Sequence, residues 1–127
     1  MSKQIITTGN APAPIGPYSQ AVQAGNTLYI SGQIAIDPAT NELISGDVGT
    51  EATQVMKNLS AILQQAGMDF SQVVKTTIFL ADMDLFAKVN EIYGTYFTGS
   101  FPARETVAVK GLPKGVQVEI SMIAVAS

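Results

Sequence analysis

The spacing of apolar residues predicts two kinds of segment that alternate along the chain. Over residues 50–66, apolar side chains recur every three or four positions, which is typical of an amphipathic helix. Residues 73–80 are instead dominated by β-branched and aromatic side chains, which favour a strand. A second helical pattern follows, and residues 105–109 and 116–125 then return to strand-like sequence. The chain is therefore predicted to mix helices with strands.

Capping residues mark the ends of the predicted helices. Thr50 is a suitable N-cap for the first helix, and Gly67 is the residue type that commonly follows a helix end. Asp82 or Asp84 is expected to cap the second helix, which should end near Phe97. The apolar stripe of that second helix consists of Phe86, Val89, Tyr93, Tyr96 and Phe97.

The first third of the chain predicts short strands and turns. Residues 3–7 favour a strand, whereas the prolines and glycines of residues 9–17 predict a loop. Residues 21–31 predict a hairpin, because Gly25-Asn26 suits a two-residue turn between strands. Gly32 follows the second strand, where glycine indicates either a bulge or a close approach of a ligand to the backbone.

The order of these segments predicts an α+β domain, with two helices against one face of a mixed sheet. No repeat or linker divides the chain, so residues 1–127 are expected to form a single domain. The sheet face away from the helices needs cover, and self-association commonly provides it.

Charge and hydrophobicity limit the expected partners and location. Only 13% of the residues are charged, and the net charge of −3 argues against a nucleic-acid partner, which would need clustered lysine and arginine. The N-terminus lacks the apolar region of a signal peptide, and no stretch approaches about 20 apolar residues. We therefore expect a cytoplasmic protein with no membrane partner.

The chain contains neither cysteine nor histidine. Disulfides, cysteine nucleophiles and Ser-His-Asp triads are therefore excluded. A zinc or iron enzyme is not expected, while a magnesium site built from oxygen ligands alone remains open.

Two charged residues near the C-terminus are candidates for chemistry. Arg104, the one arginine of the chain, follows a proline and begins a strand pattern, and Glu119 lies inside the last strand pattern. Such a pair can hold an anionic small molecule and manage a proton beside it. The two residues alone also fit a surface arginine and a solvated glutamate, and these are commoner than a binding site because most charged side chains face the solvent. Asn90 lies on the apolar stripe of the second helix and needs partners, either backbone groups or a ligand in a cleft.

Three motifs together resemble the Rid family, the reactive intermediate deaminases, which is also called the YjgF family. They are Gly-Pro-Tyr-Ser-Gln-Ala at 16–21, Leu-Tyr-Ile-Ser-Gly-Gln-Ile at 28–34, and Phe-Pro-Ala-Arg at 101–104 followed by Leu-Pro-Lys-Gly-Val at 112–116 and Val-Glu-Ile at 118–120. The resemblance covers almost the whole chain. It implies a chorismate-mutase-like fold of the bacillus type, assembled as a homotrimer with a cleft at each subunit interface.

The resemblance also implies an activity. Family members hydrolyse reactive 2-imino acids or their enamine tautomers, such as 2-iminobutanoate and 2-iminopropanoate, to 2-keto acids and ammonia. This chemistry implies a small 2-imino or 2-keto acid as the ligand, and it needs no cofactor and no metal.

Position by position, the resemblance assigns roles to residues of this chain. Arg104 corresponds to the arginine that binds the substrate, and Glu119 to the glutamate that positions the attacking water. Thr106 corresponds to a substrate-binding position at which many members have cysteine. Since the resemblance implies that this position acts largely through its backbone, threonine is expected to be tolerated, but the difference leaves the substrate preference open. The other implied cleft residues are Tyr18, Ser31, the Gly32 backbone, Asn90 and, as a wall, Phe86.

Other functions fit parts of the pattern. A non-catalytic module that binds 2-keto acids and regulates a partner would need the same arginine. Ribonuclease activity is reported in the family, but the acidic charge and the absence of histidine argue against it. A chorismate mutase would need more than one arginine to bind its dicarboxylate.

Overall fold

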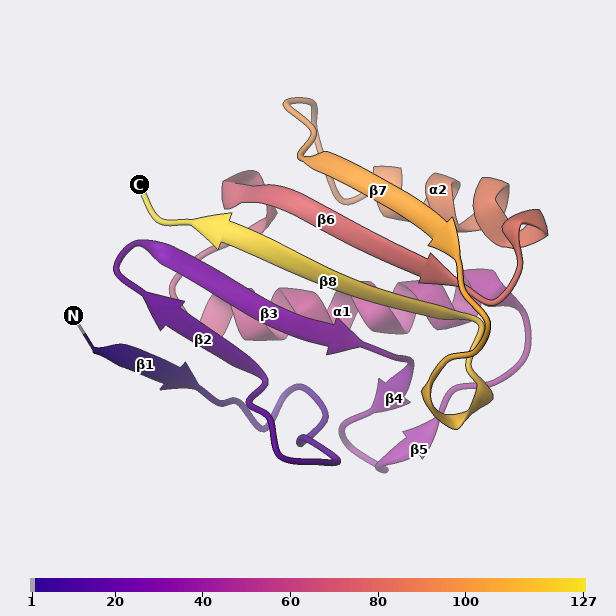
Figure 1. The fold of residues 1–127 in the computed structure, drawn as a ribbon, viewed down its shortest axis with the longest axis horizontal. Helices are drawn as coiled ribbons and strands as arrows, with labels where there is room; N and C mark the ends of the chain where they lie inside the picture. The colour runs from indigo at the N-terminus through magenta and orange to yellow at the C-terminus, as the bar shows by residue number, and fades with distance from the viewer. Residues whose placement is uncertain (1) are drawn as a thin grey trace.

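A computed structural model describes residues 2–127 of the chain, which form an α+β fold with two helices packed on a mixed sheet (Figure 1). The strand order in the main sheet is β1-β2-β3-β8-β6-β7. The edge strand β7 runs parallel to β6, and the other neighbours are antiparallel. The strands of this sheet are β1 (Lys3–Ile6), β2 (Ala21–Ala24), β3 (Thr27–Gln33), β6 (Val73–Leu80), β7 (Ala103–Ala108) and β8 (Val118–Val125).

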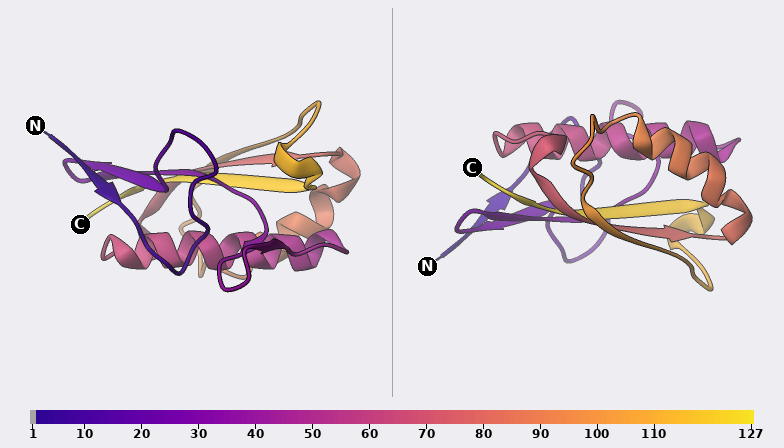
Figure 2. Two further views of the ribbon diagram at one scale, coloured as in Figure 1. Left: turned by 90° about the horizontal axis from the view of Figure 1, so that it is seen from below. Right: turned by 90° about the horizontal axis from the view of Figure 1, so that it is seen from above.

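Both helices lie on the same face of the sheet, as the sequence predicts (Figure 2). α1 (Val48–Gln65) and α2 (Phe86–Gly94) pack against each other and against the inward side chains of the strands. In β8, Val118, Ile120 and Met122 alternate with more exposed residues and join this core, because every second residue of a strand faces the same side of the sheet.

The start of α1 differs from the prediction. Asp47, and not Thr50, is the N-cap: its Oδ1 accepts a hydrogen bond from the Thr50 backbone N–H at 3.0 Å. Gly46 precedes it with a φ of +121°, a conformation that favours glycine. The helix therefore begins at Val48, and Gly67 follows its end with a φ of +76°, as expected of a helix-ending glycine.

The second helix is shorter than predicted. Asp82 caps a short 3-10 turn (Met83–Leu85) that leads into α2, and α2 ends at Gly94 rather than near Phe97. The prediction was wrong because Tyr96 and Phe97 continue the apolar spacing, although their backbone N–H groups bond to the carbonyls three residues back, as in turns, and no longer four residues back as in an α-helix. Their side chains still pack against the core.

The two strands near the predicted site begin at other residues than predicted. β7 begins at Ala103, so Arg104 is part of the strand, and β8 begins at Val118 rather than at residue 116. Residues 21–24 and 27–33 form the predicted hairpin, and the β3–β8 register shifts between Ile30 and Gln33, which confirms a bulge around Gly32. The turn at 37–41 connects two short strands, β4 (Ile36–Asp37) and β5 (Glu42–Leu43).

None of the helices described between residues 2 and 127 has the length and hydrophobicity needed to cross a membrane.

Candidate functional site

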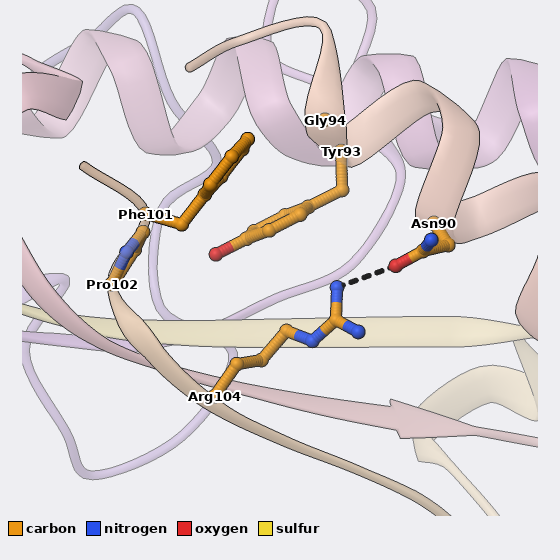
Figure 3. Close-up of a pocket in the computed structure, with 6 residues that line it drawn as sticks. All are labelled: Asn90, Tyr93, Gly94, Phe101, Pro102 and Arg104. Atoms are coloured by element: carbon orange, nitrogen blue, oxygen red, sulfur yellow. Dashed lines mark hydrogen bonds between the residues drawn. The ribbon is translucent and has the colours of Figure 1, made fainter. Parts of the chain in front are cut away.

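Arg104 lies on the edge strand β7, where its side chain meets α2 (Figure 3). Its Nη1 donates a hydrogen bond to Asn90 Oδ1 at 2.7 Å. The guanidinium carbon also lies 5.6 Å from the ring centroid of Phe86 and 5.2 Å from that of Tyr93, within the range of cation–π attraction. Three residues of one helix therefore hold the guanidinium from one side.

The spacing along α2 explains this arrangement. Phe86, Asn90 and Tyr93 are four and three residues apart, so they share one face of the helix. The Tyr93 hydroxyl donates to Thr76 Oγ1 on β6 at 2.9 Å, which fixes the ring over Arg104. Burial raises the pKa of Tyr93, although the Thr76 hydrogen bond and the Arg104 charge oppose this shift. The phenol stays neutral beside the arginine.

An open pocket of about 440 Å³ adjoins Arg104. Its lining adds residues to which the sequence reasoning gave no role in the site, among them Tyr93 and Phe101, whose rings lie next to each other in Figure 3. Phe101 and Pro102 belong to the motif that ends in Arg104, and this adjacency is the signal that could have identified them. The lining residues are Asn90, Tyr93, Gly94, Phe101, Pro102 and Arg104.

Thr106 follows Arg104 by two residues and faces the same side of β7. Its Oγ1 is buried, and it has no hydrogen-bond partner within the described part of the chain. Buried hydroxyls are normally paired, so this oxygen needs a partner from outside these residues.

Glu119 forms a second cluster, on β8. A pocket of about 320 Å³ brings it together with three residues that the sequence also identified. Burial raises the pKa of the Glu119 carboxyl, because the charged form is disfavoured away from water. The lining residues are Ile15, Tyr18, Ser31, Gly32, Pro113 and Glu119.

The bulge at Gly32 makes room for this carboxylate. A Cβ built on Gly32 would overlap the carboxyl group of Glu119, so the position admits no larger residue without displacing the acid. Ser31 Oγ donates to the Ser19 carbonyl at 2.6 Å, and the Tyr18 hydroxyl accepts from the Ile15 N–H at 3.2 Å. Both hydroxyls therefore brace the loop around the acid.

Buried polar side chains hold the surrounding loops. Gln20 accepts from the Thr8 N–H at 2.7 Å and donates to the Pro12 carbonyl at 2.8 Å, which fixes the start of the loop that carries Tyr18. Glu51, buried in the first turn of α1, accepts from the Gln117 backbone N–H at 3.1 Å. That bond anchors the chain two residues before Glu119.

The two clusters lie on opposite faces of the sheet within one chain. Arg104 pairs in register with Thr76, which pairs with Met122 on β8. Met122 and Glu119 are three residues apart on the same strand, so their side chains point to opposite faces. The structure thus joins Arg104 with Asn90 and Phe86, and Glu119 with Tyr18, Ser31 and Gly32, but it does not bring the arginine and the acid together in a single chain.

Among residues 2–127, no three Asp or Glu side chains come together in an arrangement that could hold a metal ion.

Comparisons with known proteins place this geometry in context. A family model described as Endoribonuclease L-PSP matches residues 8–126. A mouse protein named 2-iminobutanoate/2-iminopropanoate deaminase is 57% identical over 123 residues, which cover 97% of this chain and 91% of the relative.

Solved structures share this fold over nearly the whole chain. A Yersinia pestis protein, YyfA, described as a protein of unknown function of the conserved Rid family, superposes with a TM-score of 0.96 at 49% identity, covering 98% of this chain and all of that one. The Escherichia coli protein TdcF, solved with bound serine, has a TM-score of 0.93 at 40% identity and covers 98% of this chain and 99% of its own.

Proposed function

Because the chain belongs to the Rid family, which the Endoribonuclease L-PSP model describes, we propose that it is a deaminase that hydrolyses 2-imino acids to 2-keto acids and ammonia. Curated relatives at 52–57% identity bear the name of this activity over nearly their full length. We expect 2-iminobutanoate and 2-iminopropanoate to be among the substrates. The fold is then of the chorismate-mutase-like type.

The observation that carries this proposal is the way Arg104 is held. Arginine has five N–H donors, and the hydrogen bond to Asn90 uses one hydrogen of Nη1. The edge formed by Nε and Nη2 is thus available for a bidentate pair with the substrate carboxylate, a strong charge-assisted contact. Thr106 lies on the same side of β7, and its hydroxyl, which has no hydrogen-bond partner among residues 2–127, supports a contact with the bound acid.

A second copy of the chain completes the proposed site. Arg104 and Glu119 cannot reach one ligand from opposite faces of one sheet, so the acid comes from a neighbouring subunit in a homotrimer with a cleft at each interface. The exposed side chains Ile5 and Tyr29 support this assembly, because they pair through Val22 in a row on the sheet face away from the helices. An apolar row of this kind is commonly covered by another subunit.

The reaction then follows from these groups. Arg104 holds the carboxylate and orients C2 toward a water that Glu119 hydrogen-bonds. The water oxygen forms a bond to C2 while the C=N π electrons move to nitrogen, and Glu119 takes a proton from the water. Starting from the protonated imine, this addition gives a neutral carbinolamine. Glu119 returns the proton to its nitrogen and then takes the hydroxyl proton, while the C=O bond forms, the C–N bond breaks and ammonia leaves. Burial raises the pKa of the Glu119 carboxyl, which makes its carboxylate a better proton acceptor than an exposed one and so suits this exchange.

Replacement of Arg104 tests the proposal. We expect Arg104→Ala to lower kcat/KM by at least about 30-fold, because loss of a charge-assisted pair costs roughly 2 kcal/mol or more. Arg104→Lys should also be poor, since lysine lacks the planar fork. The measurement is imine hydrolysis coupled to a threonine dehydratase, and Lys57→Ala, which removes an exposed cation on α1, is the matched control.

Two outcomes would redirect the interpretation. Near-normal activity of Arg104→Ala would remove the arginine from the mechanism. If the unaltered protein bound a 2-keto acid without hydrolysing any imine, the non-catalytic module would be the better description.

A further inference from the structure

Phe101 is the least buried large hydrophobic residue of the Arg104 pocket. Its side chain is 62% exposed, although it belongs to the lining of that pocket together with Tyr93 and Pro102. Figure 3 shows its ring beside that of Tyr93, on the far side from Asn90. An aromatic ring left this exposed next to a cation is a candidate contact for a ligand.

The ring is held in place from behind. Phe101 packs against Phe97 with ring centroids 6.0 Å apart, and Phe97 packs against Tyr93 at 4.8 Å. Tyr93 is in turn anchored by its hydrogen bond to Thr76. The backbone is also constrained, since Ser100 has a φ of +48° before Phe101 and Pro102 follows it. The Phe101 ring is therefore supported on one side by a row of aromatic rings that ends at the anchored Tyr93.

The substituents of a 2-imino acid match this apolar part of the pocket. C2 carries the carboxylate, the nitrogen and the side chain of the parent amino acid. Once Arg104 holds the carboxylate and the C=N group faces the attacking water, the side chain is left to lie against the apolar lining. The pocket volume of about 440 Å³, which is that of the single chain before a second copy closes the site, falls in the roughly 300–1,000 Å³ range of ligand sites.

We propose that Phe101, with Tyr93 and Pro102 beside it, determines specificity by contacting the substrate side chain, and that it favours 2-imino acids with large apolar side chains. This inference rests on the proposed deaminase function. It assigns Phe101 a contact with the substituent of C2, whereas Arg104 and Glu119 act on the groups that all 2-imino acids share.

The test compares a small imine with a large one. Imines of alanine and leucine are generated by an amino-acid oxidase, and kcat and KM are measured for the unaltered protein, Phe101→Ala and Phe101→Leu. We expect Phe101→Ala to lower kcat/KM for the leucine-derived imine at least about fivefold, mainly through KM, and to change that for the alanine-derived imine less than twofold. Phe101→Leu should restore most of the loss.

Two controls separate specificity from general damage. Met83→Ala removes another exposed apolar side chain, outside both clusters, and should change neither imine. Light scattering checks that the assembly of each variant is unaltered. Equal losses for both imines, or no loss for either, would overturn the role of Phe101.

Failure of the deaminase proposal would be recognised separately, because the unaltered protein would then hydrolyse neither imine. In that case the same variants are compared by calorimetry with pyruvate and 4-methyl-2-oxopentanoate. A selective loss of affinity for the larger acid in Phe101→Ala supports the inference, and an equal effect on both acids contradicts it.

Discussion

The Arg104 guanidinium is oriented by neighbours that do not compete with the proposed ligand. Asn90 uses one donor, and the rings of Phe86 and Tyr93 attract the charge without hydrogen-bonding it. Cation–π contacts contribute about 0.5–2 kcal/mol, depending on how far water is excluded. The fork is therefore held in one orientation before a carboxylate arrives, and less entropy is lost on binding.

Glu119 makes the stability of the fold depend on pH. Its pKa is raised above the ordinary value of 4.5 by burial, so the folded chain holds this proton more tightly than the unfolded chain. Stability consequently falls as pH rises from that ordinary value through the raised one. The side chain of the Glu119→Gln variant cannot ionise, so the stability of this variant does not fall in this way. The difference between its thermal midpoint and that of the unaltered protein should therefore increase with pH over this interval and then level off.

Scanning calorimetry between pH 4 and 8, at one fixed protein concentration, measures this difference. The control is Glu42→Gln, which removes an exposed acid on β5. A difference that stays constant over the whole pH range would show that burial of Glu119 does not govern its ionisation.

Some of these residues were predictable from the sequence and some were not. Arg104 and Glu119 stand out by charge in apolar surroundings, and Asn90 by its place on an apolar stripe. Tyr93 gave no separate signal, because an aromatic residue at helical spacing is indistinguishable from ordinary core. The pairing of Tyr93 with Thr76 depends on how α2 lies over the sheet, and this is set by tertiary packing.

At the scale of elements, β7 and α2 build the Arg104 cluster together, since β7 carries the arginine and α2 carries the residues that contact it. A parallel pair needs a crossover between its strands, and here the chain passes through α2 between β6 and β7. This connection places the helix beside the edge strand that carries Arg104. The strand and helix pattern predicted this order, whereas one end of each helix was predicted wrongly. Asp47 rather than Thr50 caps α1, and α2 ends at Gly94 although the apolar spacing continues to Phe97.

The N-cap of α1 gives a test at this scale. Asp47→Ala should lower the thermal midpoint by about 4 °C, because alanine cannot accept the hydrogen bond from the Thr50 N–H and a helix loses stability without its N-cap. The Thr50 hydrogen bonds lower the pKa of Asp47, so the effect should shrink as acidification passes through that pKa. Thr50→Ala, which keeps the backbone bond and loses only the hydroxyl, should have the smaller effect. If Thr50→Ala were the more damaging change, Thr50 would be the cap after all.

For the whole molecule, the important feature is the position of the two clusters on opposite faces of the sheet. The register of β6, β7 and β8 imposes this arrangement, and the sequence predicts it only through the parity of Glu119 and Met122 once the pairing is known. The pairing itself is a long-range property that local patterns do not specify. The low charge and the exposed apolar row agree with a chain that associates with copies of itself.

The most direct test of a shared site mixes two inactive variants. Arg104→Ala retains Glu119, and Glu119→Gln retains Arg104, so neither homotrimer should hydrolyse imines. After equal amounts are unfolded and refolded together, random assembly gives about a quarter of the interfaces an intact arginine on one side and an intact glutamate on the other. We predict that the mixture regains about a quarter of the activity of the unaltered protein. Activity no higher than the average of the two separate variants would contradict a site built from Arg104 of one subunit and Glu119 of the next.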